Sequence, residues 1–327
     1  MRRLLLVLLL LCTPAFAADE PYGIALEGYA YPYPVDYLTI TERGEELRMA
    51  YMDVAPTANA NGQAVLLLHG RNFPASYWQP TIKRLSAAGY RVVAPDQIGF
   101  GKSAKPDLAY SFDMMAKHTA ALLDKLNLPR VHVVAHSMGG MLGVRFTRTF
   151  PDRVDRLALE APIGLEDYRR YVPPVPFERV LEQESKLTAE AYRQQLINNY
   201  SLTMPVTQVE PFVQVRERIK GSGEYPRWLR SFVAGYFVIW GQPVVHEIPL
   251  IERPTLFLMG DKDHNAPGRP FAPEALRPQM GKNLDNANVL AKQMKDAKVW
   301  SAPVGHLVHL EAEEPFHTAL LAFLAGK

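Results

Sequence analysis

The sequence predicts an α/β fold in which helices cover both faces of a mostly parallel central sheet, with a mainly helical insertion. Three observations lead to this class. Short apolar runs such as residues 64–68 and 131–135 are typical of strands buried on both faces. Helical segments alternate with these strands, which indicates a parallel sheet. The alternation stops near Gly164 and resumes at Thr255, which places the insertion between these positions.

The expected elements follow one another in a regular order. Residues 37–40 and 47–54 are predicted to form two strands around the turn Arg43-Gly44. We expect the remaining strands at 64–68, 91–94, 131–135, 157–159, 255–259 and 298–300. We expect helices at 77–88, 112–126, 138–150 and 284–297 and a last helix from residue 315.

The first residues have the pattern of a secretory signal peptide. A basic start, Met1-Arg2-Arg3, precedes an apolar run at 4–11 that is too short to span a bilayer. Ala15-Phe16-Ala17 supplies the small-x-small pattern of a cleavage site, with an alanine on each side of Phe16. We therefore expect residues 1–17 to be removed before Ala18 and the protein to be periplasmic or secreted.

Cys12 is the one cysteine of the chain and lies in this leader. A lipoprotein signal acylated at Cys12 is an alternative, which Leu11 disfavours because a small residue is expected at that position. Cleavage before Ala18 removes the cysteine, so the mature chain has no disulfide, no thiolate nucleophile and no cysteine metal site.

The composition limits the class of partner. With 327 residues, 48% hydrophobic and 21% charged, the chain is an ordinary globular protein rather than a disordered or fibrous one. Loss of Arg2 and Arg3 leaves 34 of the 36 basic residues against 34 acidic ones, which gives no electrostatic basis for nucleic-acid binding. No second apolar run reaches the roughly 18 residues of a membrane span, so no stable membrane insertion is expected after cleavage. A small-molecule substrate is the expected partner; no cofactor is indicated, and the oligomeric state is left open.

The strongest chemical signal is the segment Ala135-His136-Ser137-Met138-Gly139-Gly140. A sharp strand-to-helix turn needs small residues two positions before and after the serine, since larger side chains would collide with neighbouring elements. The turn lifts the Ser137 hydroxyl above the sheet at a helix N-terminus, where backbone N–H groups point at it. Ala135 replaces the glycine that usually starts this motif. A helix N-cap serine is the structural alternative, but the strand–helix context favours a nucleophile.

A serine hydroxyl needs a base before it can act as a nucleophile at neutral pH. His306 has the best position among nine histidines, because it follows Gly305 in a loop after the last strand and can reach over the carboxyl edge of the sheet. His309 is the close rival, with a helix-start or loop position as its simpler interpretation. The pair also suggests a metal, but no third ligand stands at a convincing spacing, so no metal is expected.

The base in turn needs a carboxylate that fixes its tautomer. The turn Gly260-Asp261-Lys262-Asp263 follows the strand at 255–259 and therefore lies at the same edge of the sheet. Asp263 is deeper in the loop and is favoured, whereas Asp261 is expected to cap the turn. Glu160, at the end of an earlier strand, is a possible substitute acid.

The segment after the first buried strand is expected to complete an oxyanion hole. Gly70 allows the chain to turn closely under the nucleophile. The backbone N–H groups of Arg71 and Met138 could then stabilise a developing negative oxygen, with Asn72 as the alternative donor. The Arg71 side chain is interpreted as a solvated loop residue, with an anchor for a substrate carboxylate as the alternative.

These segments closely resemble the α/β-hydrolase fold superfamily, in the family's order of serine, aspartate and histidine. The resemblance covers residues 35–327 apart from sequence detail in the insertion, and it includes the segment 96–103, similar to a structural turn of the family. It implies Ser137 as nucleophile, Asp263 as acid and His306 as base. Haloalkane dehalogenases and epoxide hydrolases of this superfamily carry an aspartate at the nucleophile position of this strand-to-helix turn, called the elbow. Ser137 at that position therefore argues against both activities.

The resemblance also divides the chain. Residues 35–165 and 246–327 are expected to form the α/β-hydrolase core, residues 166–245 a helical lid, and residues 18–34 an extended lead-in. Aromatic lid residues, with two residues near the elbow, are expected to line the substrate pocket: Phe73, His136, Phe177, Trp228, Phe232 and Trp240. Packing of the lid onto the core is the simpler explanation for most of the lid aromatics. The proline-rich loop 267–278 has no assigned function.

Together these features predict an exported serine hydrolase that cleaves carboxylic esters of small or apolar substrates through an acyl-enzyme. Two other reactions fit the same triad: carbon–carbon bond hydrolysis of a vinylogous dione, and cofactor-free perhydrolysis of the haloperoxidase type. A non-catalytic ligand-binding protein on the same scaffold is a third possibility. Triad chemistry serves many substrates, so the natural substrate and the acyl and alcohol preference are not determined.

Overall fold

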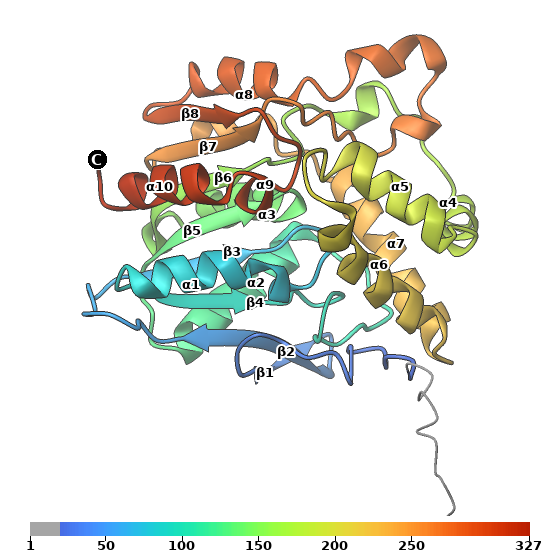
Figure 1. The fold of residues 1–327 in the computed structure, drawn as a ribbon, viewed down its shortest axis with the longest axis horizontal. Coiled ribbons are helices and arrows are strands. Elements are labelled where there is room, and N and C mark those ends of the chain that lie inside the picture. The colour runs from blue at the N-terminus through green and yellow to red at the C-terminus, as the bar shows by residue number, and fades with distance from the viewer. Residues whose placement is uncertain (1–19) are drawn as a thin grey trace, which may run out of the picture.

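The computed structural model describes residues 20–327 (Figure 1). The predicted signal peptide and its cleavage site before Ala18 lie outside the described residues. One eight-stranded sheet has the order β1-β2-β4-β3-β5-β6-β7-β8. The first two strands form an antiparallel pair, β2 pairs antiparallel with β4, and the strands from β4 to β8 are parallel. The predicted α/β class with a mostly parallel sheet is therefore confirmed.

The strands agree closely with the apolar runs of the sequence. They are β1 (Asp36–Glu42), β2 (Glu45–Val54), β3 (Ala64–Leu68), β4 (Arg91–Pro95), β5 (Val131–His136), β6 (Val154–Glu160), β7 (Thr255–Gly260) and β8 (Ala297–Ala302). All residues of β3, β5 and β7 are buried, which explains why these strands show no alternation of polar and apolar residues.

Helices cover both faces of the sheet. On one face lie α1 (Gln79–Ala87), α9 (Val308–Glu311) and α10 (Glu313–Leu324), and on the other α2 (Phe112–Lys125), α3 (Met138–Thr149) and α8 (Asn283–Ala291). The side chains of β3 alternate between these two layers, with Leu66 and Leu68 on the α2–α3 side and Val65 and Leu67 on the α1–α10 side. Within residues 20–327 no helix combines the length and apolarity needed to cross a bilayer.

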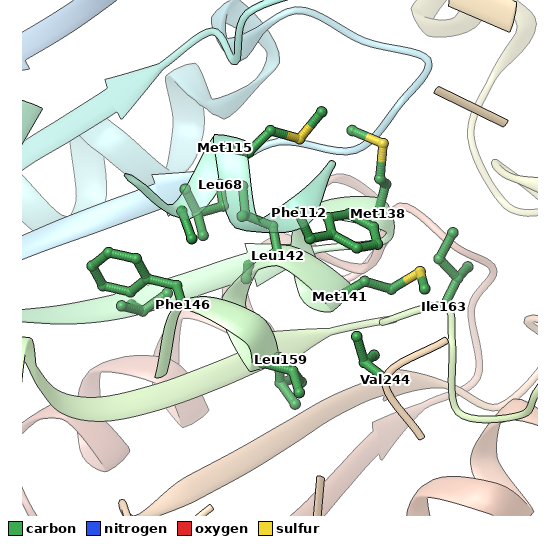
Figure 2. Packing of buried hydrophobic residues seen from close by; sticks show 14 of the residues in the cluster. Leu68, Phe112, Met115, Met138, Met141, Leu142, Phe146, Leu159, Ile163 and Val244 are labelled. Atoms are coloured by element: carbon green, nitrogen blue, oxygen red, sulfur yellow. The ribbon is translucent and has the colours of Figure 1, made fainter. Parts of the chain in front are cut away.

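Figure 2 shows the core on the side of α2 and α3. Phe112 and Leu142 pack there beside Leu68 and Leu159 of the sheet, and Met141 lies against Ile163. Each of these side chains is 2% exposed or less. This layer holds α3 against the sheet and thereby fixes the turn that precedes it.

The predicted helix at 284–297 is wrong at its end. The helix α8 stops at Ala291, and the strand β8 already begins at Ala297. The reason is pairing with β7: Thr255 lies opposite Ala297, and its N–H donates to the carbonyl of Asp296. Apolar spacing in a short segment did not distinguish the end of the helix from the start of an edge strand.

The turn between β5 and α3 consists of Ser137, whose backbone has φ 58° and ψ −121°. This conformation is strained for a residue other than glycine. A Cβ atom at Gly139 would lie 2.3 Å from the carbonyl oxygen of Leu68, and one at Gly140 would lie 2.6 Å from Cβ of Pro162. Glycine at both positions therefore allows α3 to approach the neighbouring strand ends closely enough to keep the turn tight.

Ala135 replaces the glycine that usually starts the motif around the serine, and α3 leaves room for its methyl group. A Cβ atom added at Gly143 would lie 2.9 Å from Cβ of Ala135, closer than real Cβ contacts allow. Gly143 therefore leaves the space that the methyl group of Ala135 occupies, and the strand and the helix can still meet.

Four helices between β6 and β7 form the insertion: α4 (Phe177–Ser185), α5 (Ala189–Asn199), α6 (Val206–Lys220) and α7 (Tyr225–Gly241). Figure 1 shows this helical insertion beyond the carboxyl ends of the parallel strands. The described part of the lead-in, residues 20–34, contains no strand or helix. It packs against α6 through Tyr22, Leu26 and Ile219, and the Tyr31 hydroxyl donates to Asp96 at 2.5 Å.

Substitution Gly143→Ala is expected to lower the free energy of unfolding by about 1–3 kcal/mol through overpacking, although alanine favours the helix. In an Ala135→Gly background the same substitution should cost much less, because the colliding methyl group is absent. Chemical denaturation of the wild type, both single variants and the double variant measures this coupling. Additive effects of the two substitutions would contradict the proposed contact.

Candidate active site

Three side chains from distant parts of the chain form one line of hydrogen bonds. The Ser137 hydroxyl lies 2.9 Å from Nε2 of His306, and Nδ1 of His306 lies 2.9 Å from Oδ2 of Asp263. Ser137 is 6% exposed, Asp263 2% and His306 0%. The carboxylate accepts from Nδ1–H, which leaves the lone pair of Nε2 directed at the serine hydroxyl. The structure thus brings together the three residues that the sequence analysis selected.

The loops that carry Asp263 and His306 cross in close contact. A Cβ atom at Gly260 would lie 1.9 Å from the carbonyl oxygen of Gly305, so only glycine fits there. The backbone N–H of Asn265 donates to the second carboxylate oxygen of Asp263 at 2.9 Å. The His306 N–H donates to the carbonyl of Tyr200 in the helical insertion at 2.7 Å. These contacts hold the carboxylate and the imidazole at a fixed separation.

The rival residues form a separate buried pair. His309 Nδ1 lies 2.7 Å from Oε1 of Glu160, which also accepts from the His309 backbone N–H at 2.9 Å. Both side chains are completely buried. Asp261 is exposed, and its backbone N–H donates to the carbonyl of Ala302. None of these three side chains hydrogen-bonds to the side chain of Ser137 or of His306 among the described residues; Glu160 meets Ser137 through its backbone carbonyl, which accepts from the Ser137 N–H at 3.1 Å.

The loop after β3 passes directly beside the serine. A Cβ atom at Gly70 would lie 3.1 Å from Cβ of Ser137 and 3.0 Å from Nδ1 of His136. Within residues 20–327, the backbone N–H groups of Arg71 and Met138 donate to no protein acceptor. Asn72 also lies at this side of the cavity. Free donors therefore stand where the sequence analysis expected an oxyanion hole.

His136 connects the loops around the serine. Its Nδ1 accepts from the Tyr77 hydroxyl at 2.9 Å, and its Nε2 donates to the backbone carbonyl of His306 at 3.0 Å. The Tyr77 hydroxyl accepts from the Gly70 N–H at 3.1 Å. Burial, and secondly the neighbouring rings of His306 and His309, lowers the pKa of His136 well below its ordinary value. His136 is therefore a neutral brace that fixes the loops of Gly70 and His306.

Ser137 opens on a cavity of about 330 Å³ between the sheet edge and the helical insertion. Of the predicted pocket residues, Phe73 and His136 line it. Its other walls include Ile163, Tyr200 and Tyr236, together with residues 264–271 of the loop that follows Asp263. These eight loop residues were missed as a site by sequence reasoning, although they directly follow a residue placed at the active edge of the sheet.

The prediction that Phe177, Trp228, Phe232 and Trp240 line this cavity is wrong. Phe177 stacks on Phe237 at 5.4 Å between ring centroids, and Trp228 stacks on Phe232 at 5.1 Å. The indole N–H of Trp240 donates to the carbonyl of Val172 at 3.0 Å. Phe177, Trp228 and Trp240 pack, partly buried, against the cluster of Val180, Leu229, Val233 and Tyr236 in α4 and α7, and none of the four rings lines the cavity of Ser137.

Asn265 is a second residue that the sequence analysis missed. Its side-chain amide lies 3.2 Å from Nε2 of His306, the atom that also faces the Ser137 hydroxyl. The carbonyl of Asn265 accepts from the Asn283 side chain at 3.1 Å, which ties the loop to α8. The position two residues after Asp263 could have been selected as a contact to the histidine. Within residues 20–327, no group of three or more metal-ligating side chains converges.

Comparison with known proteins places this geometry in a family. The family model described as the alpha/beta hydrolase fold matches residues 63–267. The chain is 30% identical over 302 residues to a 2-hydroxy-6-oxononadienedioate/2-hydroxy-6-oxononatrienedioate hydrolase of Burkholderia vietnamiensis, covering 88% of this chain and 94% of that protein. This protein belongs to the α/β-hydrolase fold family and is a hydrolase.

Two further relatives show how widely the likeness extends. The crystal structure of a probable hydrolytic enzyme from Pseudomonas aeruginosa is 39% identical and superimposes with a TM-score of 0.89, covering 92% of this chain and 97% of the other. A haloalkane dehalogenase of Mycolicibacterium paratuberculosis is 36% identical over 147 residues, which is 44% of this chain and 48% of the relative. The likeness to the first includes the helical insertion, whereas the second matches less than half of the chain.

Substitution Tyr77→Phe is expected to lower the free energy of unfolding by about 1–3 kcal/mol, because it leaves the Gly70 N–H and the His136 ring nitrogen buried without a partner. Tyr90→Phe is the matched control, since Tyr90 is 5% exposed and its hydroxyl has no hydrogen bond to the described residues. It should change the stability by no more than about 0.5 kcal/mol. Equal losses in urea denaturation of the two variants would argue against the brace.

Proposed function

We propose that this protein hydrolyses carboxylic esters through an acyl-enzyme formed on Ser137. The hydrogen-bonded line from Ser137 through His306 to Asp263, open to a cavity, carries this proposal. Both distances lie within the range that proton transfer between a nucleophile and its base requires. A serine rather than a carboxylate at the elbow favours attack on a carbonyl carbon.

The proposed reaction has two halves. Ser137 Oγ attacks the ester carbonyl carbon while Nε2 of His306 takes the hydroxyl proton, and Asp263 stabilises the resulting imidazolium. The N–H groups of Arg71 and Met138 donate to the oxyanion. His306 then protonates the alcohol oxygen as the carbon–oxygen bond breaks. Water, deprotonated by His306, cleaves the acyl-enzyme, which releases the acid and restores the serine.

The surroundings of the cavity support a small substrate. A volume of about 330 Å³ is in the lower part of the range for small-molecule sites. The helical insertion covers the serine and would act as a lid that limits access by water. The signal-peptide pattern in the sequence of residues 1–17 supports a periplasmic or secreted location.

Carbon–carbon bond hydrolysis is the second candidate, because the name of the relative from Burkholderia vietnamiensis denotes a hydrolase of oxo-dienedioic acids. The same serine would attack a ketone carbonyl, and the leaving group would be a carbanion stabilised by conjugation. This reaction requires a proton to be delivered to carbon rather than to an alcohol oxygen. The ester reaction needs no donor beyond His306 and is therefore preferred.

Substitution Ser137→Ala is expected to lower kcat/KM for 4-nitrophenyl esters by about 10⁴-fold or more, because the nucleophile is lost. The variant should remain folded by circular dichroism and should not react with a fluorophosphonate probe. Ser86→Ala, at a buried serine of α1, is the control and should retain both activity and labelling. Ester turnover that survives in pure Ser137→Ala protein would rule out the acyl-enzyme.

A substrate panel separates the two candidate reactions. We expect kcat/KM for 4-nitrophenyl butyrate to exceed that for a 2-hydroxy-6-oxo-dienoic acid by at least about tenfold, a difference in transition-state binding that one well-placed polar contact can supply. Spectrophotometric assays of the purified mature protein measure both reactions. Strong turnover of the dienoic acid without ester turnover would instead establish carbon–carbon bond hydrolysis.

A further inference from the structure

Arg71 reaches from the loop beside the serine towards the helical insertion. Its stem passes α7, since a Cβ atom at Gly235 would lie 3.4 Å from both Cγ and Cδ of Arg71. The guanidinium carbon lies 4.1 Å from the centroid of the Phe232 ring, a cation–π distance. Arg71 lines the cavity onto which Ser137 opens, and its side chain is 17% exposed. The positive charge of Arg71 thus lies in the cavity lining, where the loop after β3 meets α7 of the insertion.

Two guanidinium groups share one carboxylate at this point. Glu184 of α4 accepts from Arg216 at 2.7 Å and from Arg71 at 3.3 Å. Arg216 also donates to the backbone carbonyl of Glu184 at 3.2 Å, and its side chain is 5% exposed. Burial opposes ionisation of Glu184, but the charges of Arg71 and Arg216 outweigh it and lower the pKa of this carboxyl. The three groups together therefore carry one uncompensated positive charge.

The geometry indicates which arginine is available to a ligand. Arg216 makes the shorter contact with Glu184 and lies outside the cavity lining. Arg71 makes one hydrogen bond to the described protein, and its length exceeds the roughly 2.7–2.9 Å of a strong charge-assisted bond. A guanidinium has five N–H donors in a planar fork, so Arg71 can donate to a second carboxylate while it stays bonded to Glu184.

The residues that line the cavity provide no second carboxylate for Arg71. Among the described residues that line it, Glu184 is the one acidic side chain. Arg269 is the other cation, and it lies near Glu166 at the base of the loop. Burial raises the pKa of Glu166, and the charge of Arg269 opposes that rise. Arg71 therefore faces the cavity with a carboxylate that it shares, because Glu184 also neutralises Arg216.

We infer that Arg71 binds a carboxylate group of the substrate, so that the preferred substrates are esters carrying a second, anionic carboxylate directed towards α4 and α7. This inference rests on the proposed ester hydrolysis. The planar fork of arginine matches a carboxylate in two parallel hydrogen bonds, and the low exposure of the site strengthens the interaction. A neutral amide of the same shape offers Arg71 one carbonyl oxygen and no charge, so it binds less tightly.

Two matched pairs of esters test the inference on the acyl side and on the alcohol side. Monoethyl adipate is compared with the ethyl ester of adipamic acid, and 4-(butyryloxy)benzoate is compared with 4-(butyryloxy)benzamide. In at least one pair, kcat/KM of the wild type is expected to be roughly ten- to a hundredfold higher for the carboxylate than for the amide, as hydrogen bonds to a charged group provide. A ratio near one in both pairs would overturn the inference.

Variants then assign the effect to one side chain. Arg71→Met keeps an apolar stem and leaves Glu184 paired with Arg216, and it should bring the carboxylate-to-amide ratio of kcat/KM to about one, whatever the absolute rates. Arg71→Lys should retain part of the preference, because lysine keeps the charge but not the fork. Arg227→Met, at an exposed position of the same helix α7, is the charge-matched control and should keep the wild-type ratio.

The rate of Ser137 labelling by a neutral fluorophosphonate distinguishes a failure of carboxylate binding by Arg71 from a failure of the proposed ester hydrolysis. A ratio near one in Arg71→Met protein whose Ser137 still reacts with the probe supports the assignment to Arg71. A carboxylate preference that persists in Arg71→Met contradicts it while ester hydrolysis stands. Absence of labelling and of ester turnover in the wild type would instead remove the proposed function, and the inference with it.

Discussion

The site depends on the close approach of backbones at the carboxyl edge of the sheet. Ser137 keeps a strained φ of 58° because α3 is held against the ends of β3 and β6, where Gly139 and Gly140 leave no room for a Cβ atom. A second close approach, between Gly260 and Gly305, brings the loops of Asp263 and His306 together. Backbone rigidity at these two crossings, rather than the side chains themselves, sets the distances along the hydrogen-bonded line.

Buried histidines extend this rigidity into the second layer of the site. His136 links the Tyr77 hydroxyl to the His306 backbone, and His309 is paired with Glu160 in the buried interior. A buried polar group is costly unless it has a partner, so each of these bonds restricts the loop that carries it. His136 and His309 therefore stabilise the loops around His306, the residue that we propose as the base.

The cavity is built from segments that are far apart in the sequence. The loop after β3 and the loop after β7 line it, and the helical insertion contributes Tyr200 and Tyr236. Phe177 of α4 and Phe237 of α7 stack on each other instead and hold these two helices together. Polar and charged groups, foremost Arg71 with Glu184, therefore distinguish this cavity, and they lie where two separate elements meet.

Local patterns in the sequence predicted the succession of strands and helices and pointed to Ser137, Asp263 and His306, because apolar runs and glycine-bounded turns depend on near neighbours in the chain. It could not distinguish pocket aromatics from packing aromatics, since Phe177 and Trp240 differ from Tyr236 in what stands opposite them, not in their own neighbours. The tertiary structure alone decided the pairing of His309 with Glu160, the contact of Asn265 with His306 and the sharing of Glu184 by two arginines. Each of these joins residues that are distant in the sequence and meet only in the folded chain.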